Sequence, residues 1–159
     1  MTGAMTIHLV RHAKAGSRSD WAQPDELRPL TAGGVAQASA IADRLRHRPV
    51  KRILSSPYVR CMQTVEPLAE ALGLEIEQNH ALGEDTEPEH TWALLRQLAA
   101  TEAVLCSHGN VIPDAVDRAV REGAKVIGRQ TGNRKGSIWD LEIDPEGAVA
   151  SVRYTPPPE

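Results

Sequence analysis

The chain has 159 residues, of which 41% are hydrophobic and 25% are charged, and its formal net charge is -3 at pH 7. These values fit one globular domain and exclude a disordered chain, and the acidic balance argues against nucleic-acid binding. No apolar run is long enough to span a bilayer and no signal peptide is evident, so we expect a cytoplasmic protein that does not bind membranes.

Strand-like and helix-like patterns alternate along the chain. In order, they predict a strand over 6–10, a helix over 32–45, a strand over 51–55, a helix over 57–72, a strand over 74–78, a helix over 87–99, a strand over 103–107, a helix over 111–122 and strands over 136–143 and 148–154. Ser56, followed by Pro57, is expected to cap the second helix. Thr86 and Glu89 are expected to form a capping box at the start of the third helix.

This alternation predicts the α/β class, as a three-layer α/β/α sandwich with a mostly parallel central sheet and short edge strands. The apolar strand over 103–107 is expected at its centre. A single domain should cover residues 1–159, with 1–4 and 155–159 frayed. Cys61 and Cys106 are too few for a disulfide framework, and Cys106 reads as a buried thiol.

Polar residues follow three of the expected strands directly. They are Arg11 and His12 after the first strand, Ser55, Ser56 and Arg60 after the second, and Ser107, His108 and Gly109 after the strand over 103–107. Each has an ordinary structural interpretation when taken alone. Because ligands of open α/β sheets bind beyond the carboxyl ends of the strands, their joint occurrence favours a site.

The blocks "LVRHA", "SSPYVRCMQT" and "CSHG" resemble the signature blocks of the histidine phosphatase superfamily, which has the phosphoglycerate-mutase-like fold. The resemblance runs from about residue 6 to residue 140. It is closest to the small phosphohistidine phosphatases of the SixA type. It is also close to histidine phosphatase domains attached to Nudix hydrolases in actinobacteria, which share the "HAKAGSR" and "NRKGS" stretches. The chain departs from the family at Ala13, where glycine is usual, and in lacking the inserted segment that carries a glutamate acid in larger members.

The resemblance implies transfer of a phosphoryl group to His12, followed by hydrolysis of the phosphohistidine. A neutral imidazole is a competent nucleophile near pH 7. Arg11 and Arg60 would hold the phosphoryl oxygens, and a protonated His108 would add a further cationic donor. No metal or other cofactor is needed, because the arginines supply the positive charge.

The roles of several residues around the expected pocket remain open. Glu84, or Asp85 beside it, is a candidate general acid or a member of a solvated loop. Lys14 and Ser17 are expected to bind phosphate or substrate at the pocket mouth, together with Arg18. Arg134 and Lys135 reach the same rim or are exposed loop charges.

The sequence therefore predicts a metal-independent phosphatase that uses a phosphohistidine intermediate. Its partner would be a phosphohistidine protein or a small phosphomonoester or nucleotide. The alternative is a non-catalytic phosphate-binding or interaction module of the same fold. A phosphoglycerate mutase is disfavoured because the short chain has little material for a lid that shelters the phosphoenzyme from water.

Overall fold

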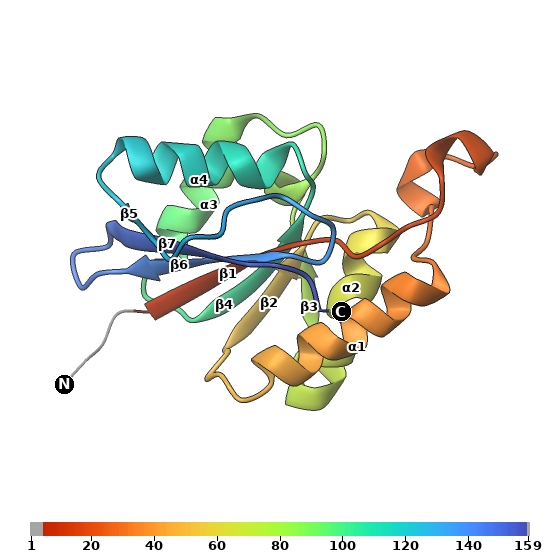
Figure 1. Ribbon diagram of the computed structural model, residues 1–159, viewed down its shortest axis with the longest axis horizontal. Coiled ribbons are helices and arrows are strands. Elements are labelled where there is room, and N and C mark those ends of the chain that lie inside the picture. The colour runs from red at the N-terminus through yellow and green to blue at the C-terminus, as the bar shows by residue number, and fades with distance from the viewer. Residues whose placement is uncertain (1–4, 159) are drawn as a thin grey trace.

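The computed structural model describes residues 5–158, which form a mixed β-sheet with helices on both faces (Figure 1). The sheet has seven strands in the order β3-β2-β4-β1-β6-β7-β5. The strands are β1 (Met5–Arg11), β2 (Arg52–Ser55), β3 (Ile76–Gln78), β4 (Ala103–Ser107), β5 (Lys125–Ile127), β6 (Ile138–Ile143) and β7 (Val149–Thr155). The helices are α1 (Ala32–Leu45), α2 (Val59–Leu72), α3 (Pro88–Gln97) and α4 (Val111–Arg121), with short 3₁₀ helices η1 (Arg18–Asp20), η2 (Asp25–Leu27) and η3 (His80–Leu82).

The sheet is parallel on one side and mixed on the other. Strands β3, β2, β4 and β1 pair in parallel, whereas β6 runs antiparallel to both β1 and β7. Helices α1 and α2 cover one face, and α3 and α4 cover the other (Figure 1). The edge strands β3 and β5 have three residues each. The predicted three-layer sandwich with a mostly parallel sheet is confirmed.

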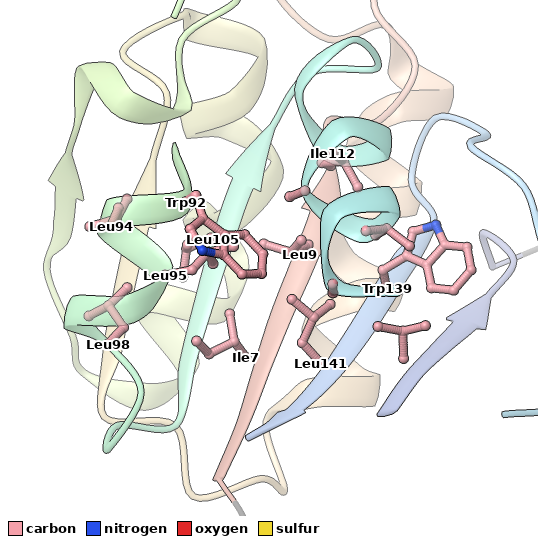
Figure 2. Packing of buried hydrophobic residues seen from close by; sticks show 14 of the residues in the cluster. Ile7, Leu9, Trp92, Leu94, Leu95, Leu98, Leu105, Ile112, Trp139 and Leu141 are labelled. Carbon is pink, nitrogen blue, oxygen red and sulfur yellow. The ribbon is translucent and has the colours of Figure 1, made fainter. Parts of the chain in front are cut away.

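Two layers of buried apolar side chains hold the helices to the sheet. In β4, Val104 packs with the layer of α1 and α2, and Leu105 with that of α3 and α4, because successive strand residues point to opposite faces. Figure 2 shows the second layer, where Leu9 and Leu105 lie near Trp92 of α3 and Ile112 of α4. All of β4 is buried between β1 and β2, as expected of the central strand. This packing fixes the backbone at the strand ends.

Helix α2 starts later than predicted. Ser56 directly follows β2 and is still hydrogen-bonded to β4, because its N–H donates to the Cys106 carbonyl (3.0 Å). The chain turns away only after Pro57, and Tyr58 takes the capping position without a side-chain cap. The prediction that Ser56 caps this helix is wrong.

The start of α3 also differs from the prediction. Glu87 occupies its capping position without a side-chain cap, and Pro88 is the first helical residue. Thr86 and Glu89 therefore do not form the predicted box. A proline is well suited to the first position, since its missing N–H has no helical partner there. Strand β5 was not predicted, because its three residues are too few for an alternating pattern.

The C-terminal tail packs on α1 as far as it is described. Arg44 Nη1 donates to the Pro156 carbonyl (3.3 Å), and Pro157 is buried. Residues 155–158 therefore pack against the domain, although they were expected to be frayed. Residues 1–4 and Glu159 lie outside the described residues. Both cysteines are buried, and burial raises the pKa of the Cys106 thiol well above its usual value, in agreement with the predicted buried thiol.

Candidate active site

The carboxyl ends of β1, β2 and β4 meet at one edge of the sheet and border a pocket of about 600 Å³. In register, Arg11 lies opposite Ser107, and Ser55 opposite Cys106. The pocket is lined by Arg11, His12, Ala15, Gly16, Ser17, Arg18, Arg28, Arg60, Glu84, Gly109, Asn110 and Lys135. The structure therefore brings the predicted nucleophile, both arginines and Glu84 together.

His12 is held in one tautomer by the backbone. Its Nδ1 lies 2.8 Å from the Ala13 carbonyl, which can only accept, so Nδ1 carries the proton and Nε2 keeps a free lone pair. Burial lowers the pKa of His12 to about 4, against the opposing hydrogen bond to Ala13. The positive charges of Arg60 and Arg11 contribute to this lowered pKa. The imidazole is consequently neutral at pH 7 and available as a nucleophile.

His108 lies beside His12, with the ring centroids 5.6 Å apart. Burial, followed by the neighbouring His12 and Arg60, lowers the pKa of His108 to about 3. The expectation of a protonated His108 is wrong, because a second charge would lie in a buried and already cationic place. His108 is a neutral hydrogen-bonding group in this state.

Ser56 orients His108. Its Oγ accepts from the Tyr58 N–H (3.3 Å) and lies 2.9 Å from His108 Nε2, to which the hydroxyl donates in one ring tautomer and from which it accepts in the other. When Nε2 accepts from the hydroxyl, the single proton of the neutral ring resides on Nδ1. That atom is buried without a partner among the described residues and lies 3.9 Å from Glu84 Oε2. A buried donor of this kind needs an acceptor, and a bound phosphoryl oxygen would supply one.

Both predicted arginines are held by hydrogen bonds from their terminal Nη nitrogens. Arg60 donates from Nη1 to the Asp25 carbonyl and from Nη2 to Asp25 Oδ2, each at 3.0 Å. Arg11 donates from Nη1 to the Asn133 carbonyl. In both residues the Nε–H is buried and has no partner within residues 5–158. Each guanidinium therefore keeps donor capacity for an anion.

Glu84 lies next to these groups. Its Oε2 is 3.4 Å from Arg60 Nη2 and 3.3 Å from Arg18 Nη2. The Asn110 side chain donates to the Glu84 carbonyl (2.8 Å) and holds this segment at the pocket. Asp85 is exposed and does not line the pocket. Of the two candidate acids, Glu84 has the suitable position.

The residues predicted at the pocket rim line two different hollows in the structure. Ser17 and Arg18 line the pocket, as expected, and so does Lys135, for which an exposed loop position was the alternative. Lys14 and Arg134 instead line a separate hollow of about 230 Å³ beside α1. Lys14, which was expected to bind phosphate, is therefore not among the residues that line this pocket, and its N–H donates to Gln37 Oε1 of α1 (2.9 Å).

Asp25 and Arg28 of the "DELRPL" stretch were not predicted. The Asp25 carboxylate bonds both Arg60 and Arg28, at 3.0 Å each. Burial would raise the pKa of Asp25, but these arginines together lower it. Arg28 is 6% exposed and also donates to the Gly16 carbonyl. A charged pair at a three-residue spacing is the only sequence signal, and it also occurs on ordinary surfaces.

Residues 5–158 contain neither a cluster of metal ligands nor a membrane-spanning helix. No cluster of three or more His, Cys, Asp or Glu side chains suited to hold a metal ion occurs among them. None of their helices has the length and apolar character needed to cross a membrane.

The chain was compared with known proteins. The family model of the histidine phosphatase superfamily (branch 1) matches residues 7–87. The 8-oxo-(d)GTP phosphatase of Mycolicibacterium smegmatis is 36% identical over 159 residues, which are 97% of this chain and 49% of that protein. The chain spans about half or less of the length of the curated relatives it matches.

Solved structures agree with the fold. A SixA-type protein from Nakamurella multipartitia superposes with a TM-score of 0.72 at 25% identity, covering 99% of this chain and 97% of that one. The protein histidine phosphatase SixA complexed with tungstate gives a TM-score of 0.71 at 23% identity, with 96% of each chain covered. With the matched half of the sequence carrying His12 and Arg60, the chain belongs to the histidine phosphatase superfamily, branch 1.

Proposed function

We propose that this protein is a metal-independent phosphatase in which His12 carries the phosphoryl group. The observation that carries the proposal is the state of His12, a neutral ring with its free Nε2 beside Arg11 and Arg60. Nε2 attacks phosphorus, an N–P bond forms, and the P–O bond to the leaving group breaks with its electron pair on oxygen. Water then attacks phosphorus and the N–P pair returns to Nε2.

The surrounding donors fit this reaction. Charge in the loose transition state spreads over three equatorial oxygens. The Nε–H groups of Arg11 and Arg60 are buried donors that have no acceptor among residues 5–158, and His108 Nδ1 would be a third in the tautomer that carries its proton there. Such fixed donors stabilise developing charge better than water does, since they need no reorganisation. Glu84 would protonate an alkoxide leaving oxygen and accept a proton from the attacking water.

For the substrate we propose a small phosphomonoester or nucleotide, or a protein phosphohistidine. The similarity to an 8-oxo-(d)GTP phosphatase supports the nucleotide, and the fold shared with SixA-type proteins leaves phosphohistidine as the second candidate. A panel of a nucleotide, a sugar phosphate, p-nitrophenyl phosphate and a phosphohistidine peptide would rank these classes.

The proposed nucleophile is tested by His12→Ala, with the exposed His47→Ala as its matched control. We expect His12→Ala to lower phosphate release at least 10³-fold and to abolish an acid-labile, alkali-stable phosphoenzyme, while His47→Ala retains both. Circular dichroism checks folding, and EDTA should leave the wild-type rate unchanged. Wild-type-like activity in His12→Ala would refute the assignment. Phosphate binding without turnover of any substrate would identify the non-catalytic module instead.

A further inference from the structure

Lys135 is a pocket residue to which the proposed phosphoryl transfer gives no role. The loop that carries it is tied to the nucleophile strand, since the Gly136 N–H donates to the carbonyls of Arg11 and His12, both at 3.1 Å. On its other side, Asn133 Nδ2 donates to the Gly109 carbonyl (2.7 Å). The backbone of Lys135 is thereby fixed beside the site, while its side chain lines the pocket.

The charges around Lys135 are unbalanced. Five cationic side chains line the pocket, namely Arg11, Arg18, Arg28, Arg60 and Lys135. The carboxylates in contact with them are those of Asp25 and Glu84, and both are bonded to arginines. Burial, and then Arg11 and Arg28, lower the pKa of Lys135. Its ammonium group therefore lies in a positive field and lacks a carboxylate to offset it among residues 5–158.

The proposed transfer of a single phosphoryl group to His12 makes no use of the positive charge of Lys135. The proposed function already assigns the buried donors of Arg11 and Arg60, together with His108, to the group that His12 attacks. The pocket volume of about 600 Å³ lies within the range of sites for whole small molecules. Its lining contains no Trp, Tyr or Phe on which a base or sugar ring would stack. The pocket thus recognises charge rather than an apolar group.

We propose that Lys135 binds a second phosphate of the substrate, so that the site prefers a diphosphate, whose terminal phosphoryl group is transferred to His12. This inference rests on the proposed function and deepens it. In the transfer the N–P bond forms, the P–O–P bridge breaks, and the bridging oxygen leaves with the electron pair as part of a phosphate. Lys135 offsets the charge that this leaving phosphate gains, so a proton from Glu84 matters less than for an alkyl ester.

Substitution of Lys135 with Gln tests the proposal, and Arg134→Gln is the matched control. The two changes remove one positive charge each from adjacent residues, but Arg134 lines the other hollow. The quantity measured is the ratio of kcat/KM for ADP to kcat/KM for p-nitrophenyl phosphate, which cancels general effects on His12. We expect Lys135→Gln to lower this ratio roughly 10- to 100-fold, the range for a lost charged hydrogen bond. Lys135→Arg should restore most of it, and Arg134→Gln should leave it unchanged.

A binding experiment separates this inference from the proposed function. Calorimetry with the wild-type protein should show methylenediphosphonate binding at least 10-fold more tightly than methylphosphonate, and Lys135→Gln should remove the preference. Equal binding of the two phosphonates, or an unchanged preference in Lys135→Gln, would overturn the role of Lys135. A preserved preference in a protein that hydrolyses nothing would refute the phosphatase and leave the diphosphate site standing.

Discussion

At the scale of single residues, the orientation and protonation of each side chain in the site depend on the groups that it contacts. A histidine can present either nitrogen, and here the Ala13 carbonyl selects the tautomer of His12, while the Ser56 hydroxyl holds His108 at Nε2. Both rings are neutral because burial excludes further positive charge near the arginines. The site therefore combines permanent cations with neutral imidazoles, which suits an anionic substrate and a nitrogen nucleophile.

Glu84 is tested at this scale. If it protonates the leaving oxygen, Glu84→Gln should slow hydrolysis of alkyl phosphates by roughly 10²–10⁴-fold. The same change should scarcely affect p-nitrophenyl phosphate or phosphohistidine, whose leaving groups need less help. Asp85→Asn is the control, since Asp85 is exposed beside the pocket. Steady-state kinetics on both substrate types decide the matter, and small, equal effects on all substrates would exclude Glu84 as the acid.

At the scale of elements, the turn between β4 and α4 approaches the end of β1 unusually closely. A Cβ atom on Gly109 would lie 2.6 Å from the Cζ of Arg11, a distance that carbon atoms do not tolerate. The guanidinium of Arg11 occupies the space that every other residue would need. The glycine of "CSHG" is thus explained by packing against a functional side chain.

Gly109→Ala should consequently displace Arg11. We expect kcat/KM to fall roughly 10- to 100-fold, the range for losing a hydrogen bond to a charged group. Gly33→Ala is the matched control, because a Cβ there meets only Thr31 Oγ1 at 3.8 Å. That helix change should keep the activity and slightly raise the melting temperature. Kinetics and thermal melts of both variants test this, and wild-type kinetics in Gly109→Ala would contradict it.

The helices and strands with long apolar patterns could be predicted from the sequence alone. The site residues that stand at the ends of these strands could be predicted with them. His12 and His108 were identifiable because each directly follows an apolar strand, and the carboxyl ends of parallel strands lie at the same edge of a sheet. The rim was not predictable in this way. Lys14 and Lys135 look alike in the sequence, yet one turns to α1 and the other into the pocket, because loop hydrogen bonds decide the direction.

At the scale of the whole molecule, a second buried polar cluster ties β1 to its neighbours away from the pocket. His8 is 1% exposed, and its Nδ1 lies 2.6 Å from Asp140 Oδ1 while its Nε2 lies 3.0 Å from Glu102 Oε2. Arg48 donates to the same Glu102 carboxylate (2.9 Å). Burial alone would lower the pKa of His8, but Asp140 and Glu102 together raise it above 6.5.

This cluster makes stability depend on pH. A group with a raised pKa in the folded state contributes its full stability below its unfolded pKa of about 6.5, and that contribution is lost as pH rises through the folded pKa. At pH 6, His8→Gln should cost about 3 kcal/mol of unfolding free energy, as for a broken buried ion pair. Urea titrations at pH 6 and pH 9 should show this difference shrinking at the higher pH, whereas His47→Gln should show none. A difference that does not change with pH would mean that His8 stays neutral.

The contact between Arg60 and Asp25 has a consequence for turnover. Both terminal nitrogens of Arg60 are engaged by Asp25 in the free protein, so an incoming phosphate must share the guanidinium with a resident carboxylate. The same competition acts on inorganic phosphate at the end of the proposed reaction. Asp25 is thus a resident competitor for Arg60, and under the proposed reaction we expect this competition to weaken product inhibition and to hasten the release of phosphate.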